Sequence, residues 1–123
     1  MFLLIKKYLK TGRVIVSILF LISNNFESFA TTYYFSSSKG NDSFSFEQAQ
    51  KQSTPWKSLE KLNTVIPYLK PGDSVLFRRG DIFVGSLSLA VSGSATHLIS
   101  FGAYGNKSKP IPQINGRISL SNW

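Results

Sequence analysis

The sequence predicts a mainly β fold that carries a single amphipathic helix. Short apolar runs recur through the second half of the chain, with turn-favouring residues between them. One helical repeat of apolar residues occurs near the middle, and no second one follows. Val75, Leu87, Ile99 and Ile111 stand at successive steps of twelve, a spacing typical of a sandwich, a barrel or a coiled β-solenoid. Periodicity alone leaves these three architectures open.

The first 30 residues have the pattern of a signal peptide. Four basic residues open the chain, residues 14–22 form an apolar run, and Ser28 and Ala30 place small side chains where a signal peptidase inspects them. The alternative is a membrane anchor, but a spanning helix needs about 20 apolar residues. We therefore expect cleavage after Ala30, a mature segment of residues 31–123, a secreted or periplasmic location, and no membrane association once the leader is removed.

Charge and cysteine content narrow the function classes. The formal net charge is +8, and the leader supplies +3 of it, which leaves +5 on residues 31–123. This surplus suits an acidic polysaccharide as partner, but the basic residues are spread out, so a solvated surface is the preferred interpretation. Without cysteine, a disulfide framework, a thiolate metal site and a cysteine nucleophile are excluded. Export and the lack of a basic, aromatic-lined motif argue against nucleic acid as a partner.

The mature segment opens with a strand and a loop. The aromatic cluster at residues 32–35 predicts the first strand, and residues 36–45 are rich in Ser, Gly, Asn and Asp, which predicts a loop. Asn41 and Asp42 suggest a calcium site at first, but the further oxygen ligands of such a loop are missing. We therefore expect a turn that side-chain to backbone hydrogen bonds stabilise.

A helix is predicted to begin at Thr54 and Pro55. The Thr54 hydroxyl is suited to cap free backbone N–H groups, and proline fits the first helical position. Pro67 ends the pattern, so the helix should be about ten residues long. Its apolar face consists of Trp56, Leu59, Leu62 and then Val65 or Ile66.

A turn and a series of strands follow the helix. Pro71, Gly72 and Asp73 predict a type II turn, because glycine accepts the positive φ that this turn requires. The apolar runs that we expect to form strands are residues 75–77, 87–89, 98–101 and 111–114.

The order of these segments resembles the N-terminal part of secreted right-handed parallel β-helix proteins, the pectin-lyase-like superfamily. The most specific matching stretch is residues 71–83, Pro-Gly-Asp-Ser-Val-Leu-Phe-Arg-Arg-Gly-Asp-Ile-Phe. The other matching stretches are residues 33–37, 40–43, 53–59, 69–70, 99–105 and 110–116, with Trp123 at the end.

The resemblance implies the first coils of a right-handed parallel β-helix, with the N-terminal strand and the amphipathic helix covering the open first end. Trp56, Leu59 and Leu62 would pack on the first coil. Family members continue through many more coils, so residues 31–123 would be the cap and the first coils of an incomplete β-helix domain. The side chains expected inside the coil are Val75, Phe77, Leu87, Leu89, Ile99 and Phe101.

The resemblance assigns no catalytic, cofactor-binding or metal-binding residue to this chain. In the family's lyases and hydrolases the reacting groups, and the calcium that some lyases use, belong to later coils. Among local candidates, a turn-stabilising role is preferred for Asp73 and Asp81 over a catalytic pair. A solvated or ion-paired role is preferred for the Arg78-Arg79 pair, and an exposed loop position for His97. For the aromatic residues we expect core packing in preference to sugar stacking; they are Tyr33, Tyr34, Tyr104 and Trp123.

Three functions remain in competition. The first is the N-terminal capping part of a secreted carbohydrate-active β-helix protein related to polysaccharide lyases or hydrolases, which lacks the catalytic coils and is inactive alone. The second is a non-catalytic β-helix surface or adhesive protein that binds glycans. The third is a small free-standing exported β domain that binds an acidic partner.

Overall fold

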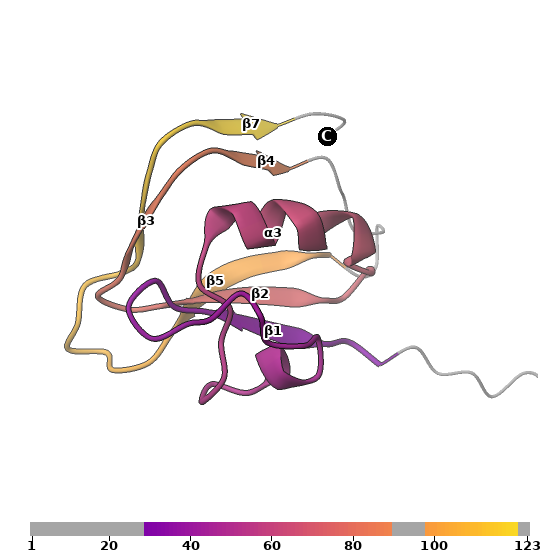
Figure 1. The fold of residues 1–123 in the computed structure, drawn as a ribbon, viewed down its shortest axis with the longest axis horizontal. Helices are drawn as coiled ribbons and strands as arrows, with labels where there is room; N and C mark the ends of the chain where they lie inside the picture. The colour runs from indigo at the N-terminus through magenta and orange to yellow at the C-terminus, as the bar shows by residue number, and fades with distance from the viewer. Residues whose placement is uncertain (1–28, 90–97, 121–123) are drawn as a thin grey trace, which may run out of the picture.

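The computed structural model describes residues 29–89 and 98–120 (Figure 1). The predicted leader up to residue 28, His97 and Trp123 lie outside the described residues. Among those described, no helix is long and apolar enough to span a membrane. The elements are β1 (Thr32–Phe35), η1 (Gln48–Gln50), α3 (Leu59–Val65), η2 (Ile66–Tyr68), β2 (Ser74–Arg78), β3 (Ile82–Val84), β4 (Leu87–Leu89), β5 (Ser100–Tyr104), β6 (Gln113–Asn115) and β7 (Ile118–Leu120).

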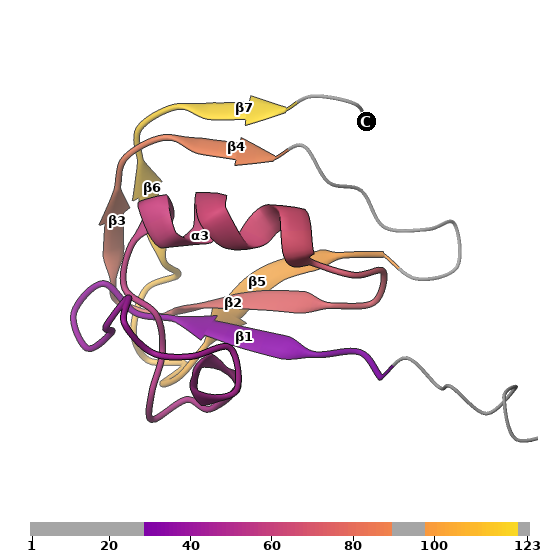
Figure 2. The same ribbon diagram turned by 45° about the vertical axis from the view of Figure 1, so that its right-hand side comes forward.

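The strands form three small sheets, and every pairing is parallel. One sheet has the order β1-β2-β5, the second pairs β3 with β6, and the third pairs β4 with β7. The chain therefore makes a turn through β2, β3 and β4, and then lays β5, β6 and β7 on these strands in the same order. Figure 2 shows the three sheets on three sides of α3. This is the mainly β fold of the prediction, and its parallel stacking is consistent with the start of a coiled β architecture.

The twelve-residue step was the wrong unit of repetition. Val75 pairs with Phe101, and Leu87 pairs with Ile118, because one turn of chain contains three strands and their corners. The prediction located β1, β2 and β4 but missed β3 and β7. It also placed the runs at 98–101 and 111–114 two residues before β5 and β6 begin, since the register with the preceding turn, and not hydrophobicity, sets where a strand starts.

Paired residues in a parallel sheet present their side chains on the same face, which gives ladders of apolar side chains inside the coil. Tyr33, Val75 and Phe101 form one ladder, and Phe35 and Phe77 belong to the next. The expected inward residues Val75, Phe77 and Leu87 are buried, and Leu89 and Ile99 are half-buried against the core. Phe101 shares the face of Val75 but is 37% exposed, because it lies on the last described turn.

The predicted start of the helix was wrong. Ser58 is the N-cap, with its Oγ accepting a hydrogen bond from the Lys61 N–H, and α3 begins at Leu59. Trp56 is extended and pairs with the outer edge of β1: its N–H donates to the Tyr34 carbonyl, and its carbonyl accepts from the Ser36 N–H. Thr54 instead donates its hydroxyl to the Gln48 carbonyl. The backbone groups at the edge of β1 require hydrogen-bond partners. Trp56 provides them in an extended conformation, and the local preference for helix at this position is therefore not realised.

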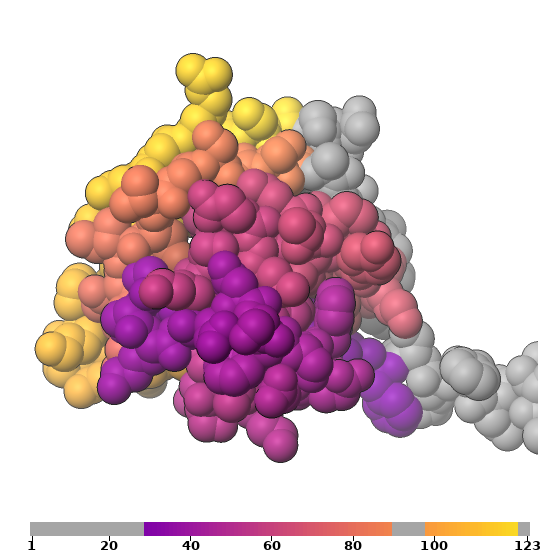
Figure 3. Space-filling view, viewed as in Figure 1, coloured from indigo at the N-terminus to yellow at the C-terminus, as the bar shows by residue number. Residues whose placement is uncertain are grey.

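The predicted apolar face of the helix is correct from Leu59 onward, whereas Trp56 lies before the helix. Leu59, Leu62, Val65 and Ile66 are buried, and fully buried Trp56 joins the same core from its extended segment. The helix is fastened to the third sheet by Asn63, whose amide donates to the Ser86 carbonyl and accepts from the Ser88 N–H. Figure 3 shows one face of the whole molecule. The indigo and magenta atoms of the N-terminal segments fill the centre of that view, and the orange and yellow strands lie at its margin.

The turn before β2 agrees with the prediction. Gly72 has a φ of 94°, and the Asp73 N–H donates to the Lys70 carbonyl at 3.0 Å. Glycine at this position relieves the strain that a Cβ would create, as a type II turn requires.

Candidate functional site

Asp81 holds the loop after β1 against the turn between β2 and β3. Its side chain accepts hydrogen bonds from Ser36 Oγ at 2.6 Å, Ser38 Oγ at 2.8 Å and the Ser38 N–H at 3.3 Å, and Arg78 lies 3.8 Å away. Burial alone would raise the pKa of this carboxyl. The hydrogen bonds and the Arg78 charge outweigh burial, so the pKa of Asp81 lies below its usual value.

Asp42 fastens the approach to the helix. It accepts hydrogen bonds from the Lys57 N–H at 2.8 Å, the Ser58 N–H at 3.0 Å and the Ser58 hydroxyl. Burial would raise the pKa of Asp42, but these hydrogen bonds lower it on balance. Asn41 makes the expected local turn, accepting from Ser43 N–H and Oγ. The hydrogen-bonding role was predicted, whereas the long-range partners of Asp42 were not, because no local pattern points to them.

Asp73 and Asp81 are not brought together. Asp73 precedes β2 and Asp81 follows it, and each binds groups at its own end of the strand. The preference for turn stabilisation over a catalytic pair is in keeping with this geometry. Arg78 is ion-paired as expected and also donates to Ser38 Oγ at 3.1 Å. Arg79 binds through its backbone N–H to the Tyr104 carbonyl.

The described aromatic candidates pack in the protein. Tyr33 stacks on Trp56 with ring centroids 5.6 Å apart, and Tyr34 meets Tyr104 edge to face at 4.9 Å. Tyr104 is 9% exposed, and its hydroxyl is the one buried side-chain polar atom without a hydrogen-bond partner within the described ranges. Burial raises the pKa of Tyr104 to about 12. These contacts are those of core packing, with Tyr33 and Tyr34 half-buried.

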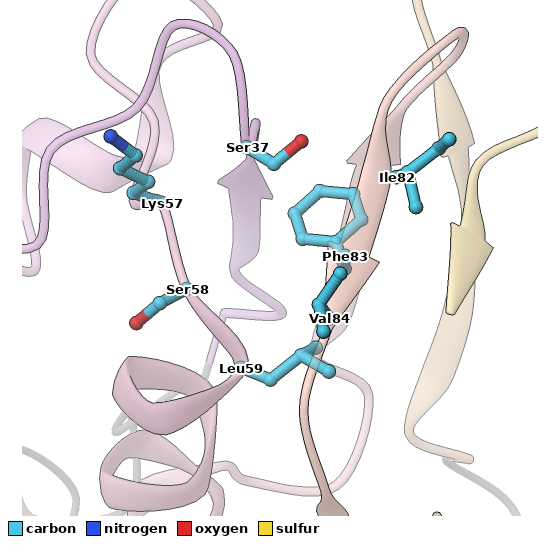
Figure 4. Close-up of a pocket in the computed structure, with 7 residues that line it drawn as sticks. All are labelled: Ser37, Lys57, Ser58, Leu59, Ile82, Phe83 and Val84. Carbon is cyan, nitrogen blue, oxygen red and sulfur yellow. The ribbon is translucent and has the colours of Figure 1, made fainter. Parts of the chain in front are cut away.

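A small pocket lies between the start of α3 and the free side of β3. Its volume is about 230 Å³, below the range of about 300–1,000 Å³ that is usual for ligand sites. Strand β3 pairs with β6 on one side, and Figure 4 shows the pocket along its other side. The lining residues are Ser37, Lys57, Ser58, Leu59, Ile82, Phe83 and Val84.

The chemistry of the pocket is mainly apolar. The Phe83 ring and the side chains of Leu59 and Val84 provide much of its lining, whereas the Lys57 amine points away from the cavity in Figure 4. The Ser58 hydroxyl is occupied by Asp42. No Asp, Glu or His side chain lines the pocket, and the described residues contain no group of three His, Asp or Glu side chains that could hold a metal ion. No pattern in the sequence points to this pocket, since strand and helix meet there only in three dimensions.

The last described turn of strands leaves apolar side chains exposed. Phe101 on β5, and Ile118 and Leu120 on β7, pair with Val75, Leu87 and Leu89 and so share their inward face. Yet Ile118 is 51% and Leu120 is 61% exposed. These three residues, which we call the open rung, present apolar side chains beside strand edges that lack a further partner among residues 29–89 and 98–120.

Fold and surface together define a mainly β fold of small parallel sheets around one short helix, with an arrangement consistent with the start of a coiled β stack. One end is closed by β1, Trp56 and α3, and the other ends in the open rung.

Comparison with known proteins connects this architecture with glycoside hydrolases. The chain is 38% identical over 100 residues to a lacto-N-biosidase of Bifidobacterium longum subsp. longum. The matched region covers 78% of this chain and 6% of that protein. It is also similar to the crystal structures, native and selenomethionine, of the GH136 lacto-N-biosidase from Eubacterium ramulus, with 40% identity and a TM-score of 0.54, covering 65% of this chain and 12% of the other. No family model matches the chain.

These similarities refine the expectation from the sequence. The chain is similar to a small part of a larger carbohydrate-active enzyme, a glycoside hydrolase that acts on oligosaccharides. They give no support to the pectin-lyase and polysaccharide-lyase part of that expectation.

Proposed function

We propose that residues 31–123 form the N-terminal cap and first coils of an exported right-handed parallel β-helix protein of the glycoside hydrolase type, acting on oligosaccharides as the lacto-N-biosidases do. In this proposal the cap closes and stabilises the start of the stack. The reacting groups, and any calcium, belong to coils outside these residues, and the cap alone is inactive.

The observation that carries the proposal is the contrast between the two ends of the stack. At the capped end, Trp56, Leu59 and Leu62 are at most 1% exposed. At the other end the open rung leaves large apolar side chains in water, at a cost of about 25 cal/mol for each Å² that a further coil would bury. A repeat architecture needs a polar cap at each end, and only one end has one among the described residues.

The 38–40% identity to lacto-N-biosidases supports the choice of hydrolase over lyase. The chain spans 6% of the curated relative and 12% of the solved one. Export is supported by the leader pattern, and the surplus of positive charge still suits an acidic glycan as partner.

The test uses the protein as its source organism makes it. An antiserum against the cap is used to blot cell and extracellular fractions, and the immunoprecipitated product is sized and incubated with oligosaccharides. We expect an extracellular product much larger than this chain that hydrolyses a glycosidic bond. A large product that binds oligosaccharides without hydrolysing them would favour the adhesive alternative. A product of this chain's size that is monomeric and melts cooperatively would contradict the proposal.

A further inference from the structure

Within the described part of the chain, Thr31 is the first residue that the folded domain holds by its backbone. Its N–H donates to Asp73 Oδ1 at 2.9 Å, and its carbonyl accepts a hydrogen bond from the Ser74 N–H at 2.8 Å. Strand β1 starts at the next residue. On the other side Ala30 is exposed and Phe29 is 80% exposed. The boundary between anchored and exposed chain thus falls at the Ala30–Thr31 bond.

Asp73 is a buried carboxylate with no cationic partner among residues 29–89 and 98–120. It is 2% exposed, and its second oxygen, Oδ2, accepts from the Lys70 N–H at 2.8 Å. The ion pair found within the described part of the chain is Arg78 with Asp81. Carboxylates buried to this degree are usually paired with a positive charge, because desolvating an unpaired charge costs several kcal/mol.

The leader pattern places the predicted cleavage at this same bond. Hydrolysis of the Ala30–Thr31 peptide bond by a signal peptidase consumes one water molecule. It leaves a carboxylate on Ala30 and an amine on Thr31, which takes up a proton at neutral pH. The donor at 2.9 Å from Asp73 would then be an α-ammonium group in place of a neutral amide N–H.

We propose that removal of the leader creates a buried ion pair between the α-ammonium group of Thr31 and the carboxylate of Asp73, which locks the first strand of the cap onto β2. The proposal rests on the export part of the proposed function and is independent of the carbohydrate activity. A hydrogen bond with an ionised donor or acceptor is about twice as strong as one between neutral groups, and the ammonium group adds a positive charge directly beside the Asp73 carboxylate, which the neutral amide N–H lacks. The cap is therefore completed only in the processed protein.

The position of the cut is decisive. A cut one residue earlier would leave the ammonium group on Ala30, about 3.8 Å further along the chain, and a cut one residue later would remove the donor. The other charged or titratable groups near this site are Tyr33, Lys70 and Glu47. Burial chiefly raises the pKa of Tyr33, and the charges of Asp73 and Glu47 raise it further, so Tyr33 is neutral at neutral pH. Lys70 approaches Asp73 through its backbone N–H.

The first measurement is the N-terminus of the exported product. The full chain with its own leader is expressed in a secreting host, and the intact mass and N-terminal sequence of the product are determined. We expect Thr31 as the first residue. An unprocessed product would overturn both the ion pair and the proposed export, and a different first residue would overturn the ion pair alone.

The second measurement is the pKa of the Thr31 amine, by competitive acylation across a pH series in buffer and in denaturant. We expect a pKa above the ordinary range of about 7.7–8.0 in the native protein and a return to that range in denaturant. Because the folded pKa is raised, this contribution to stability is present below about pH 8 and is lost as the pH rises through the folded value. An ordinary pKa in the native protein would overturn the ion pair and leave the export proposal intact.

Two variants provide matched controls. Insertion of one alanine between Ala30 and Thr31, with cleavage kept before the inserted residue, retains the Thr31 amide bond to Asp73 but displaces the ammonium group. We expect the amine of this variant to have an ordinary pKa. Asp73→Asn should have the same effect on the amine, whereas Asp42→Asn, which removes a carboxylate that contacts Lys57 and Ser58, should leave the raised pKa unchanged.

Discussion

At the residue scale, polar side chains in this domain fasten backbone segments to one another. Asp42, Asp73 and Asp81 each accept hydrogen bonds from loop or turn residues. None of the three faces another acid across a cavity. Their partners identify them as anchors of the backbone.

The hydroxyl of Tyr104 has no partner among the residues that the structure describes, so we expect its removal to be favourable. Tyr104→Phe should raise the free energy of unfolding by about 1 kcal/mol, because an unsatisfied buried polar group costs about that much. Tyr104→Leu should lower it, since the edge-to-face contact with Tyr34 is lost. Urea unfolding followed by Trp56 fluorescence measures both. A clear loss of stability in the phenylalanine variant would show that the hydroxyl has a partner.

Because the pKa of Asp81 is lowered in the folded protein, we expect the free energy of unfolding to depend on pH in the acidic range. In the unfolded chain the pKa of the Asp81 carboxyl is about 3.9, which is above its pKa in the folded protein. Between these two pKa values the unfolded state therefore binds more protons than the folded state. The contribution of Asp81 is complete above the unfolded pKa and is lost as the pH falls through the lower folded pKa. Asp81→Asn should cost about 1–3 kcal/mol at neutral pH and flatten the acid side of a stability profile measured by urea unfolding. Glu60→Gln, on an exposed face of α3, should leave the profile unchanged.

At the element scale, the helix shows how a tertiary contact can displace a local signal. Thr54 and Pro55 have the right chemistry for a helix start, and Leu59, Leu62 and Val65 have the right period. Both features are present in the sequence. Trp56 nevertheless pairs with β1 in an extended conformation, and Ser58 is the N-cap of the helix. The face of a helix is set by its own period, while its first residue depends on what its neighbours need.

The two candidate caps give a direct test. Ser58→Ala removes the N-cap and the hydroxyl bond to Asp42, and should lower the free energy of unfolding by about 1–2 kcal/mol. Thr54→Ala removes one exposed bond to the Gln48 carbonyl and should cost about 0.5 kcal/mol. Urea unfolding compares them. A larger loss in the threonine variant would support the start that the sequence suggested and contradict the structure.

At the scale of the whole molecule, the two ends of the parallel sheets differ in how well their apolar side chains are buried. One end is sealed by aromatic and aliphatic side chains, and the other presents the open rung beside unpaired strand edges. Such an edge is a template for further strands, whether from the same chain or from another.

We expect residues 31–123, when produced alone, to associate through the open rung. Replacing Ile118 and Leu120 together by lysine should shift the chain toward monomer in sedimentation velocity, because charges on the rung oppose stacking. Val84→Lys is the matched control: Val84 is 72% exposed, but it lies on β3, in the first turn of strands, and should leave the association unchanged. Equal effects of both changes, or a wild-type chain that is monomeric at high concentration, would contradict the capped-stack interpretation.

The sequence by itself determined the class of the fold, the apolar face of α3, the glycine turn before β2 and the absence of cysteine chemistry, because each of these depends on local residue type and period. It also indicated the anchoring roles of Asp42 and Asp81 without their partners. Only the tertiary structure decided the register that joins Val75 to Phe101, the true start of the helix, the small pocket beside β3 and the meeting of Thr31 with Asp73. Each of these is a contact between segments far apart along the chain, and their geometry is fixed only when the coils stack.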